Sequence, residues 1–148
     1  ESQLDRFLMR ISLGYPSRDS ERKLLAGNGR RAAADALLPV ISRQQLQQLQ
    51  AAALAVHASD ALLDYVQDLI AATRNGQWFA QGLSPRAGIA LLRAAKTIAL
   101  MEGRDYVAPD DVQAILPQVI AHRLVPVGHA GRGAVEQVRA MMQAVPLS

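Results

Sequence analysis

Apolar residues recur at every third or fourth position along most of this chain, the spacing that places them on one face of an α-helix. The clearest runs follow Ser42, Ser59, Ser84 and Pro109, and a last run covers about residues 134–144. Serine is a favoured N-cap because its hydroxyl accepts a hydrogen bond from a free amide of the first turn. The pattern therefore predicts an all-α fold built as a helical bundle.

Several short signals predict where the helices begin and end. Ser42-Arg43-Gln44-Gln45 has the S-x-x-Q form of a capping box. In Ser84-Pro85, proline occupies the first helical position, where no amide donor is needed. We also expect a helix over about residues 18–25, and we expect Asn75-Gly76 and Gly103 to end two later helices.

The helix that begins at Pro109 carries two irregular features. Pro117 lies inside the run and is expected to kink or divide the helix, because proline lacks an amide donor. Ala108 precedes Pro109 and offers no capping side chain, which is expected to weaken the helix start by ~1 kcal/mol.

One segment departs from the helical pattern. Residues 7–13 crowd apolar side chains around Arg10 and Ser12, which is typical of a strand. A single strand leaves its backbone amides and carbonyls without partners. We therefore expect an orphan β-strand whose sheet lies in an α/β or β domain outside this sequence.

The composition of the chain argues against several kinds of site and segment. The chain has 148 residues, enough for one domain with a hydrophobic core, and it has no cysteine, which excludes disulfides and thiolate metal sites. Its three histidines lack ligand spacing, so no metal site is expected. There is no run of 18 uninterrupted apolar residues and no signal-peptide pattern, so we expect no membrane span and a cytoplasmic location.

The basic residues are mostly arginine. There are 14 arginines and two lysines against 13 carboxylates, which gives a formal net charge of +3. A guanidinium offers planar, bidentate recognition of carboxylate or phosphate, whereas lysine offers a point charge. Codon usage in a GC-rich genome explains the overall excess, so only arginines in special local settings indicate a function.

Two arginines have such settings. Arg6 lies between Asp5 and Phe7, just before the expected strand; a solvated arginine paired with Asp5 is the alternative interpretation. Arg86 lies in the first turn of the helix that begins at Ser84-Pro85, where the helix dipole disfavours a cation. A guanidinium beside exposed helix amides makes an anion site, and a solvent-screened arginine without a role is the alternative.

Four sequence blocks carry a family resemblance through their order. They are LDRF, then GYPSRDSER, then GLSPRAGIALLRAAK, and finally EGRDYVAPDDVQAILPQVIAHRL. Together with their spacing they cover most of residues 1–124, and they resemble the C-terminal part of MoxR-type AAA+ ATPases. The resemblance implies that residues 1–16 are the edge of an αβα nucleotide-binding core. It further implies that residues 17–124 form a helical lid, and residues 125–148 a linker and a C-terminal amphipathic helix.

The same resemblance implies roles for particular residues. Arg6 matches the arginine finger, which acts in trans on the nucleotide of a neighbouring subunit. Arg86 matches the sensor 2 arginine, which contacts the γ-phosphate, in cis or in trans. Tyr15 and Pro16 fall where such ATPases often line the adenine pocket. ATP, Mg²⁺, a ring that is a hexamer by analogy, and chaperone-like action on partners are implied for the full-length protein, with von Willebrand A domain proteins among those partners.

The chain lacks the motifs that hold phosphates. It contains no GxxxxGK[ST] sequence and no apolar run that ends in paired carboxylates to hold magnesium, so by itself it is expected neither to bind ATP tightly nor to hydrolyse it. The arginine excess leaves a second class of function, a stand-alone basic helical module that binds nucleic acid. Alternating charges along most helices and only six aromatic residues disfavour that alternative, because few rings are available to stack on bases.

Overall fold

The computed structural model describes residues 4–26, 37–128 and 133–147. Within these ranges the chain is helical, which confirms the predicted all-α class. The elements in chain order are the 3-10 helix η1 (Leu4–Arg6), α1 (Arg18–Leu25), α3 (Arg43–Ala55), α4 (Asp60–Arg74), α5 (Pro85–Met101), α6 (Pro109–Ile120), the 3-10 helix η2 (Ala121–Arg123) and α7 (Ala134–Ala144).

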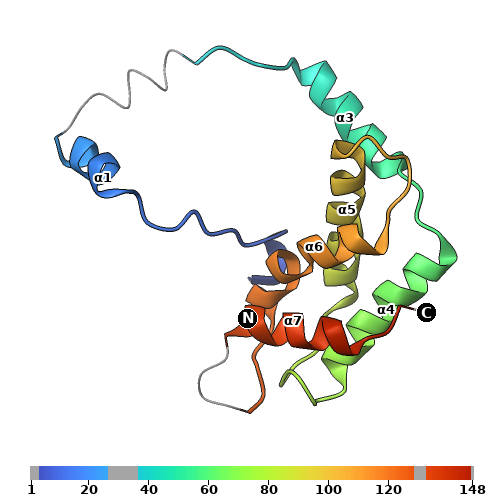
Figure 1. Ribbon diagram of the computed structural model, residues 1–148. Helices are drawn as coiled ribbons and strands as arrows, with labels where there is room; N and C mark the ends of the chain where they lie inside the picture. The colour runs from blue at the N-terminus through green and yellow to red at the C-terminus, as the bar shows by residue number, and fades with distance from the viewer. Residues whose placement is uncertain (1–3, 27–36, 129–132, 148) are drawn as a thin grey trace.

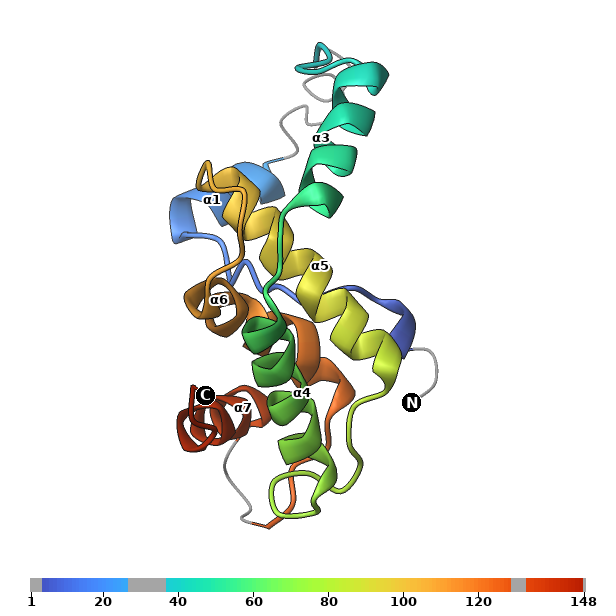
Figure 2. The ribbon, with the colours of Figure 1, turned by 90° about the vertical axis from the view of Figure 1, so that its right-hand side faces the viewer.

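Helices α4 to α7 form the body of the molecule, with α5 and α6 at its centre (Figures 1 and 2). Helix α3 projects from one end of this bundle, and α1 stands apart at the far end of the segment that leaves η1 (Figure 1). The hydrophobic core lies between the four bundle helices and is closed by connecting segments. Its largest fully buried side chains include Tyr65, Leu69, Phe79, Leu91, Leu116, Ile120 and Met141.

Small residues allow α5 to approach its neighbours closely. Its buried positions are Ala87, Gly88, Ala90, Leu91, Ala94, Ala95 and Ala99. A Cβ added at Gly88 would lie 2.5 Å from Cδ1 of Ile70 on α4. The absence of a side chain at Gly88 therefore leaves room for Ile70 and lets α4 lie close to the start of α5.

Two short backbone pairings hold the connecting segments in place. His57 pairs with Tyr106 in a parallel bridge, and the His57 amide donates to the Asp105 carbonyl at 2.8 Å. Phe79 pairs with Pro126 in an antiparallel bridge. The connectors before α5, before α6 and after η2 are therefore part of the packed body.

The predicted helix boundaries are confirmed where local capping chemistry is strong. Ser42 and Gln45 form the full capping box, with bonds of 2.7 and 3.1 Å. Ser59 and Ser84 each accept a hydrogen bond from an amide of their own first turn. After α5, the chain turns at Gly103, where φ is +74°.

The expected strand over residues 7–13 is not formed. The segment is irregular, and Arg10 directs its amide to the Gln118 carbonyl at 2.8 Å, at the end of α6. The physical reason is that the described residues supply no neighbouring strand, so the backbone bonds to a helix end and to solvent instead.

Pro117 does not divide α6, which runs unbroken from Pro109 to Ile120. The expected division was wrong because tertiary packing outweighs the one lost amide bond. Pro117 is itself buried, and Leu116 and Val119 beside it are fully buried.

The missing cap at Ala108 is compensated from within the helix. The Asp111 carboxylate accepts a hydrogen bond from the Ala108 amide at 2.8 Å. It also forms an ion pair with Arg104, with a nearest separation of 2.6 Å. The helix start is therefore held by an acidic side chain of its own first turn.

The described part of the chain before α4 remains mostly exposed. Neither α1 nor α3 buries a side chain, and Leu46 and Leu49 on the apolar stripe of α3 are 45% and 51% exposed. None of the helices described here is long and apolar enough to cross a membrane.

Candidate functional site

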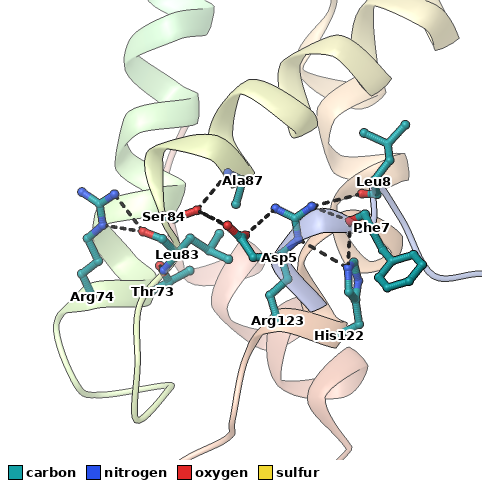
Figure 3. A network of polar contacts seen from close by, with 10 residues as sticks. All are labelled: Asp5, Phe7, Leu8, Thr73, Arg74, Leu83, Ser84, Ala87, His122 and Arg123. Atoms are coloured by element: carbon teal, nitrogen blue, oxygen red, sulfur yellow. Dashed lines mark hydrogen bonds and ion pairs between the residues drawn. The ribbon is translucent and has the colours of Figure 1, made fainter. Parts of the chain in front are cut away.

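The start of α5 is fixed by contacts from α4. The carbonyl of Leu83 accepts two hydrogen bonds from the Arg74 guanidinium, at 3.0 and 2.8 Å. The amide of Leu83 donates to the hydroxyl of the buried Thr73 at 3.0 Å. With both its backbone groups bonded, Leu83 places Ser84 at a defined position, from which the Ser84 hydroxyl caps the Ala87 amide at 3.3 Å (Figure 3).

Gly82 permits this arrangement because it lies directly against Arg74. A Cβ at position 82 would come within 2.8 Å of the Arg74 Cα and would overlap its side chain as well. A backbone atom cannot move aside as a flexible side chain can. The approach of this connector to α4 therefore requires glycine.

A polar network joins η1 to the start of α5 and to η2 (Figure 3). The Ser84 hydroxyl, besides capping α5, donates to the Asp5 carboxylate at 3.1 Å. Arg123 on η2 donates from Nη1 to the same carboxylate at 3.1 Å and from Nη2 to the Phe7 carbonyl at 2.6 Å. Segments far apart in the sequence are thus held together by one carboxylate and one guanidinium.

Arg123 is the most deeply buried member of the network. Its side chain is 5% exposed, against 32% for Asp5. Burial lowers the pKa of Arg123, the negative charge of Asp5 acts in the opposite direction, and the positive charge of Arg86 lowers it further. The guanidinium of Arg86 therefore lies within electrostatic reach of Arg123, and the start of α5 carries a concentration of positive charge.

The structure brings Arg6 and Arg86 to the same end of α5. Arg6 is the last residue of η1 and adjoins Asp5, which contacts Ser84; Arg86 follows Ser84 by two residues. Both side chains are exposed, and neither forms a hydrogen bond or ion pair with another of the described residues. The alternative interpretation of Arg6 as a partner of Asp5 is not what the structure has, because Asp5 pairs with Arg123.

Tyr15 and Pro16 do not belong to this cluster. They lie on the segment that leads from η1 toward α1, and the Tyr15 side chain is fully exposed. Among the described residues, no side-chain hydrogen bond or ion pair joins either of them to Arg6 or Arg86. Similarly, no group of acidic, histidine or cysteine side chains suited to a metal occurs among the residues described.

Sequence reasoning missed Arg123 and the role of Asp5. His122-Arg123 looks like an ordinary basic helix end, and Asp5 looks like a local partner for Arg6. The contact between Arg123 and Asp5 spans 118 positions in the sequence. A local sequence pattern does not indicate a contact between residues so far apart. The capping role of Ser84, by contrast, could be predicted from its position directly before Pro85.

The sequence profile of the AAA lid domain family matches residues 71–144, which covers α5, α6 and α7 and the site at the start of α5. The chain is also similar to proteins of known family. It is 39% identical to the chaperone MoxR1 of Mycobacterium tuberculosis, over 84% of this chain and 35% of that protein. It is 36% identical to the protein MoxR of Paracoccus denitrificans, over 81% of this chain and 41% of that protein.

A solved structure agrees with these relatives. This chain superposes on a crystal structure from Cytophaga hutchinsonii, described as that of an ATPase, with a TM-score of 0.79. The two are 26% identical, and the match covers 98% of this chain and 48% of that one. The chain belongs to the AAA lid domain family and, within it, to the MoxR group of AAA+ proteins. It spans between about a third and two fifths of the length of these curated relatives. The comparisons do not favour a nucleic-acid-binding module.

Proposed function

We propose that this chain is the lid-bearing part of a MoxR-type AAA+ ATPase in which ATP hydrolysis drives chaperone-like remodelling of partner proteins. The observation that carries the proposal is the placement of Arg6 and Arg86, two exposed guanidinium groups on elements that meet through Asp5 and Ser84. The nucleotide-binding core corresponds to the part of the relatives that this chain does not span. In this division residues 1–16 belong to the core edge, 17–124 to the lid and 125–148 to a linker and a final helix.

The positive charge at the start of α5 suits the phosphates of a nucleoside triphosphate. The first turn of α5 contains Arg86 and no acidic residue, so the helix dipole and the side chain present positive charge together. In this proposal Arg86 serves as the sensor 2 arginine and binds the γ-phosphate. MgATP supplies the transferable phosphoryl group, whose charge spreads over its equatorial oxygens in the transition state.

Arg6 acts as the arginine finger in trans. Its side chain is exposed and forms no hydrogen bond or ion pair with the described residues, so it is available to the nucleotide of a neighbouring subunit. A positioned guanidinium neutralises the developing charge and is worth ~10³ to 10⁵ in rate. Lysine is a poor substitute because it cannot form two parallel bonds to phosphate oxygens.

Several further parts of the proposal rest on the family. Tyr15 and Pro16 line the adenine pocket, for which the fully exposed Tyr15 ring is available. The subunits assemble into a ring, by analogy a hexamer, in the cytoplasm, and the remodelled partners include proteins with a von Willebrand A domain. The name of the chaperone MoxR1 supports the chaperone-like activity. The chain alone does not hydrolyse ATP, because it lacks the phosphate-cradling motif.

The test compares turnover with nucleotide binding in the full-length protein that contains this segment. We expect Arg6→Ala to lower kcat by ~10³ or more while nucleotide binding stays largely intact, because the finger acts on the neighbour's transition state. Arg86→Ala is expected to weaken both, and Arg93→Ala, an exposed arginine elsewhere on α5, to change neither. Normal turnover in Arg6→Ala would contradict the proposal.

A further inference from the structure

We propose that Arg123 is a positioning residue for this phosphoryl transfer and that, together with Ser84, it fixes Arg6 relative to the start of α5 by holding the residues on both sides of it. The inference rests on the function proposed above and adds a residue to it. Arg123 does not reach the nucleotide in this arrangement, because its side chain is only 5% exposed and is already bonded within the chain.

The geometry places Arg6 between two bonded neighbours. Nη1 of Arg123 donates a hydrogen bond to the Asp5 carboxylate at 3.1 Å, and Nη2 donates one to the Phe7 carbonyl at 2.6 Å (Figure 3). The planar fork of arginine suits this two-point contact. Arg6 itself is left exposed, so its backbone position is defined while its guanidinium stays free to reach outward.

The same carboxylate connects Arg6 to α5. Asp5 accepts from the Ser84 hydroxyl at 3.1 Å, and Ser84 is the N-cap of the helix whose first turn carries Arg86. Leu83, just before it, is bonded through both backbone groups to Thr73 and Arg74 on α4. A displacement of the start of α5, such as binding of a γ-phosphate at Arg86 would produce, is therefore transmitted through Asp5 to Arg6.

The positional part of the inference is tested in this chain without nucleotide. The chain has no cysteine, so spin labels attach only at introduced positions. We choose Leu8→Cys, just after the held residues, and Met101→Cys at the far end of α5; both sites are exposed. Double electron–electron resonance should give a narrow distance distribution that broadens in Asp5→Asn and Arg123→Gln and stays narrow in Arg93→Gln.

The catalytic part is tested in the full-length protein. We expect Asp5→Asn and Arg123→Gln to lower kcat by roughly 10- to 100-fold with the KM for ATP within about twofold, because misplacement by an ångström is costly in the transition state. Arg123→Lys should retain only part of the rate, since an ammonium lacks the planar fork that holds Asp5 and Phe7 together. Asp5→Asn is the variant least disturbing to the fold, because its side chain is one third exposed.

The outcomes separate the inference from the proposed function. If Arg6→Ala abolishes turnover while Asp5→Asn and Arg123→Gln keep a narrow distance distribution or a normal kcat, the positioning role of Arg123 is wrong and the proposed function stands. If the Arg6→Ala variant hydrolyses ATP at the normal rate, the proposed function is wrong, and so is the proposal that Arg123 positions a catalytic arginine. Broadened distances together with a reduced kcat in both variants support the inference.

Discussion

Asp111 shows how one side chain takes the place of a missing helix cap. Its carboxylate accepts hydrogen bonds from both terminal nitrogens of Arg104, at 2.7 and 2.6 Å, and from the Ala108 amide at 2.8 Å. The hydrogen bonds from Arg104 lower the pKa of Asp111; burial acts against them, and the Ala108 amide adds to the lowering. The ionised form of Asp111 is therefore favoured by folding.

We expect Asp111→Asn to lower the free energy of unfolding by about 1–3 kcal/mol at pH 7, because the buried acceptor loses its charge. Since the folded-state pKa lies below the ordinary value of 3.8, the contribution of the carboxylate is complete above that value and is lost as the pH falls through the folded-state pKa. Urea unfolding should thus show a difference between wild type and variant that shrinks below pH 3.8.

The neighbouring Asp110→Asn is the matched control. Asp110 is exposed and forms no ion pair with the other described residues, so we expect a change within about 0.5 kcal/mol. A difference for Asp111→Asn that stays constant down to low pH would contradict the assigned role of its charge.

At the scale of single residues, the sequence singled out Arg6 and Arg86 but did not indicate the contact between Asp5 and Arg123. The unusual setting of Arg86 could be read from Ser84-Pro85, because capping depends on adjacent residues. The contact of Asp5 with Arg123 depends on how η1 and η2 pack, which no local pattern records.

At the scale of elements, the boundaries that follow from local chemistry were predicted, and those that depend on neighbours were not. The capping serines begin three helices where expected. Residues 7–13 form no strand among the described residues, because the sheet expected to pair with them lies outside this sequence. Of the two effects expected of Pro117, a kink or a division, the division does not occur, because burial of the helix is a tertiary effect.

Two equivalent caps should differ in their effect on stability. Ser59 caps α4, which buries five residues including Tyr65 and Leu69, so Ser59→Ala should lower the free energy of global unfolding by ~1 kcal/mol. Ser42 caps α3, which buries none, so Ser42→Ala should increase amide exchange within α3 and leave global unfolding nearly unchanged. Thermal unfolding and hydrogen exchange measure the two effects. Equal losses of global stability in both variants would show that α3 folds as part of the bundle.

At the scale of the whole molecule, the described chain divides into a packed bundle and an exposed part before it. Leu13 is 94% exposed and Val40 is 96% exposed. Both belong to the part of the chain before α3, which runs outside the bundle in Figure 1. The bundle could be predicted from periodicity, and the family from the order of four blocks. The contact that brings η1, and with it Arg6, to the start of α5 depends on the packing of η1 against η2, which no local sequence pattern indicates.

The most direct test of the account is a subunit-mixing assay with the full-length protein. Arg6→Ala subunits keep an intact phosphate site but offer no finger, and subunits with a disabled phosphate-binding loop keep Arg6 but no site of their own. If Arg6 acts in trans, mixing the two inactive proteins creates interfaces where an intact site meets an intact finger, and ATP hydrolysis is regained. Mixtures that form rings and stay as inactive as either protein alone would contradict the account.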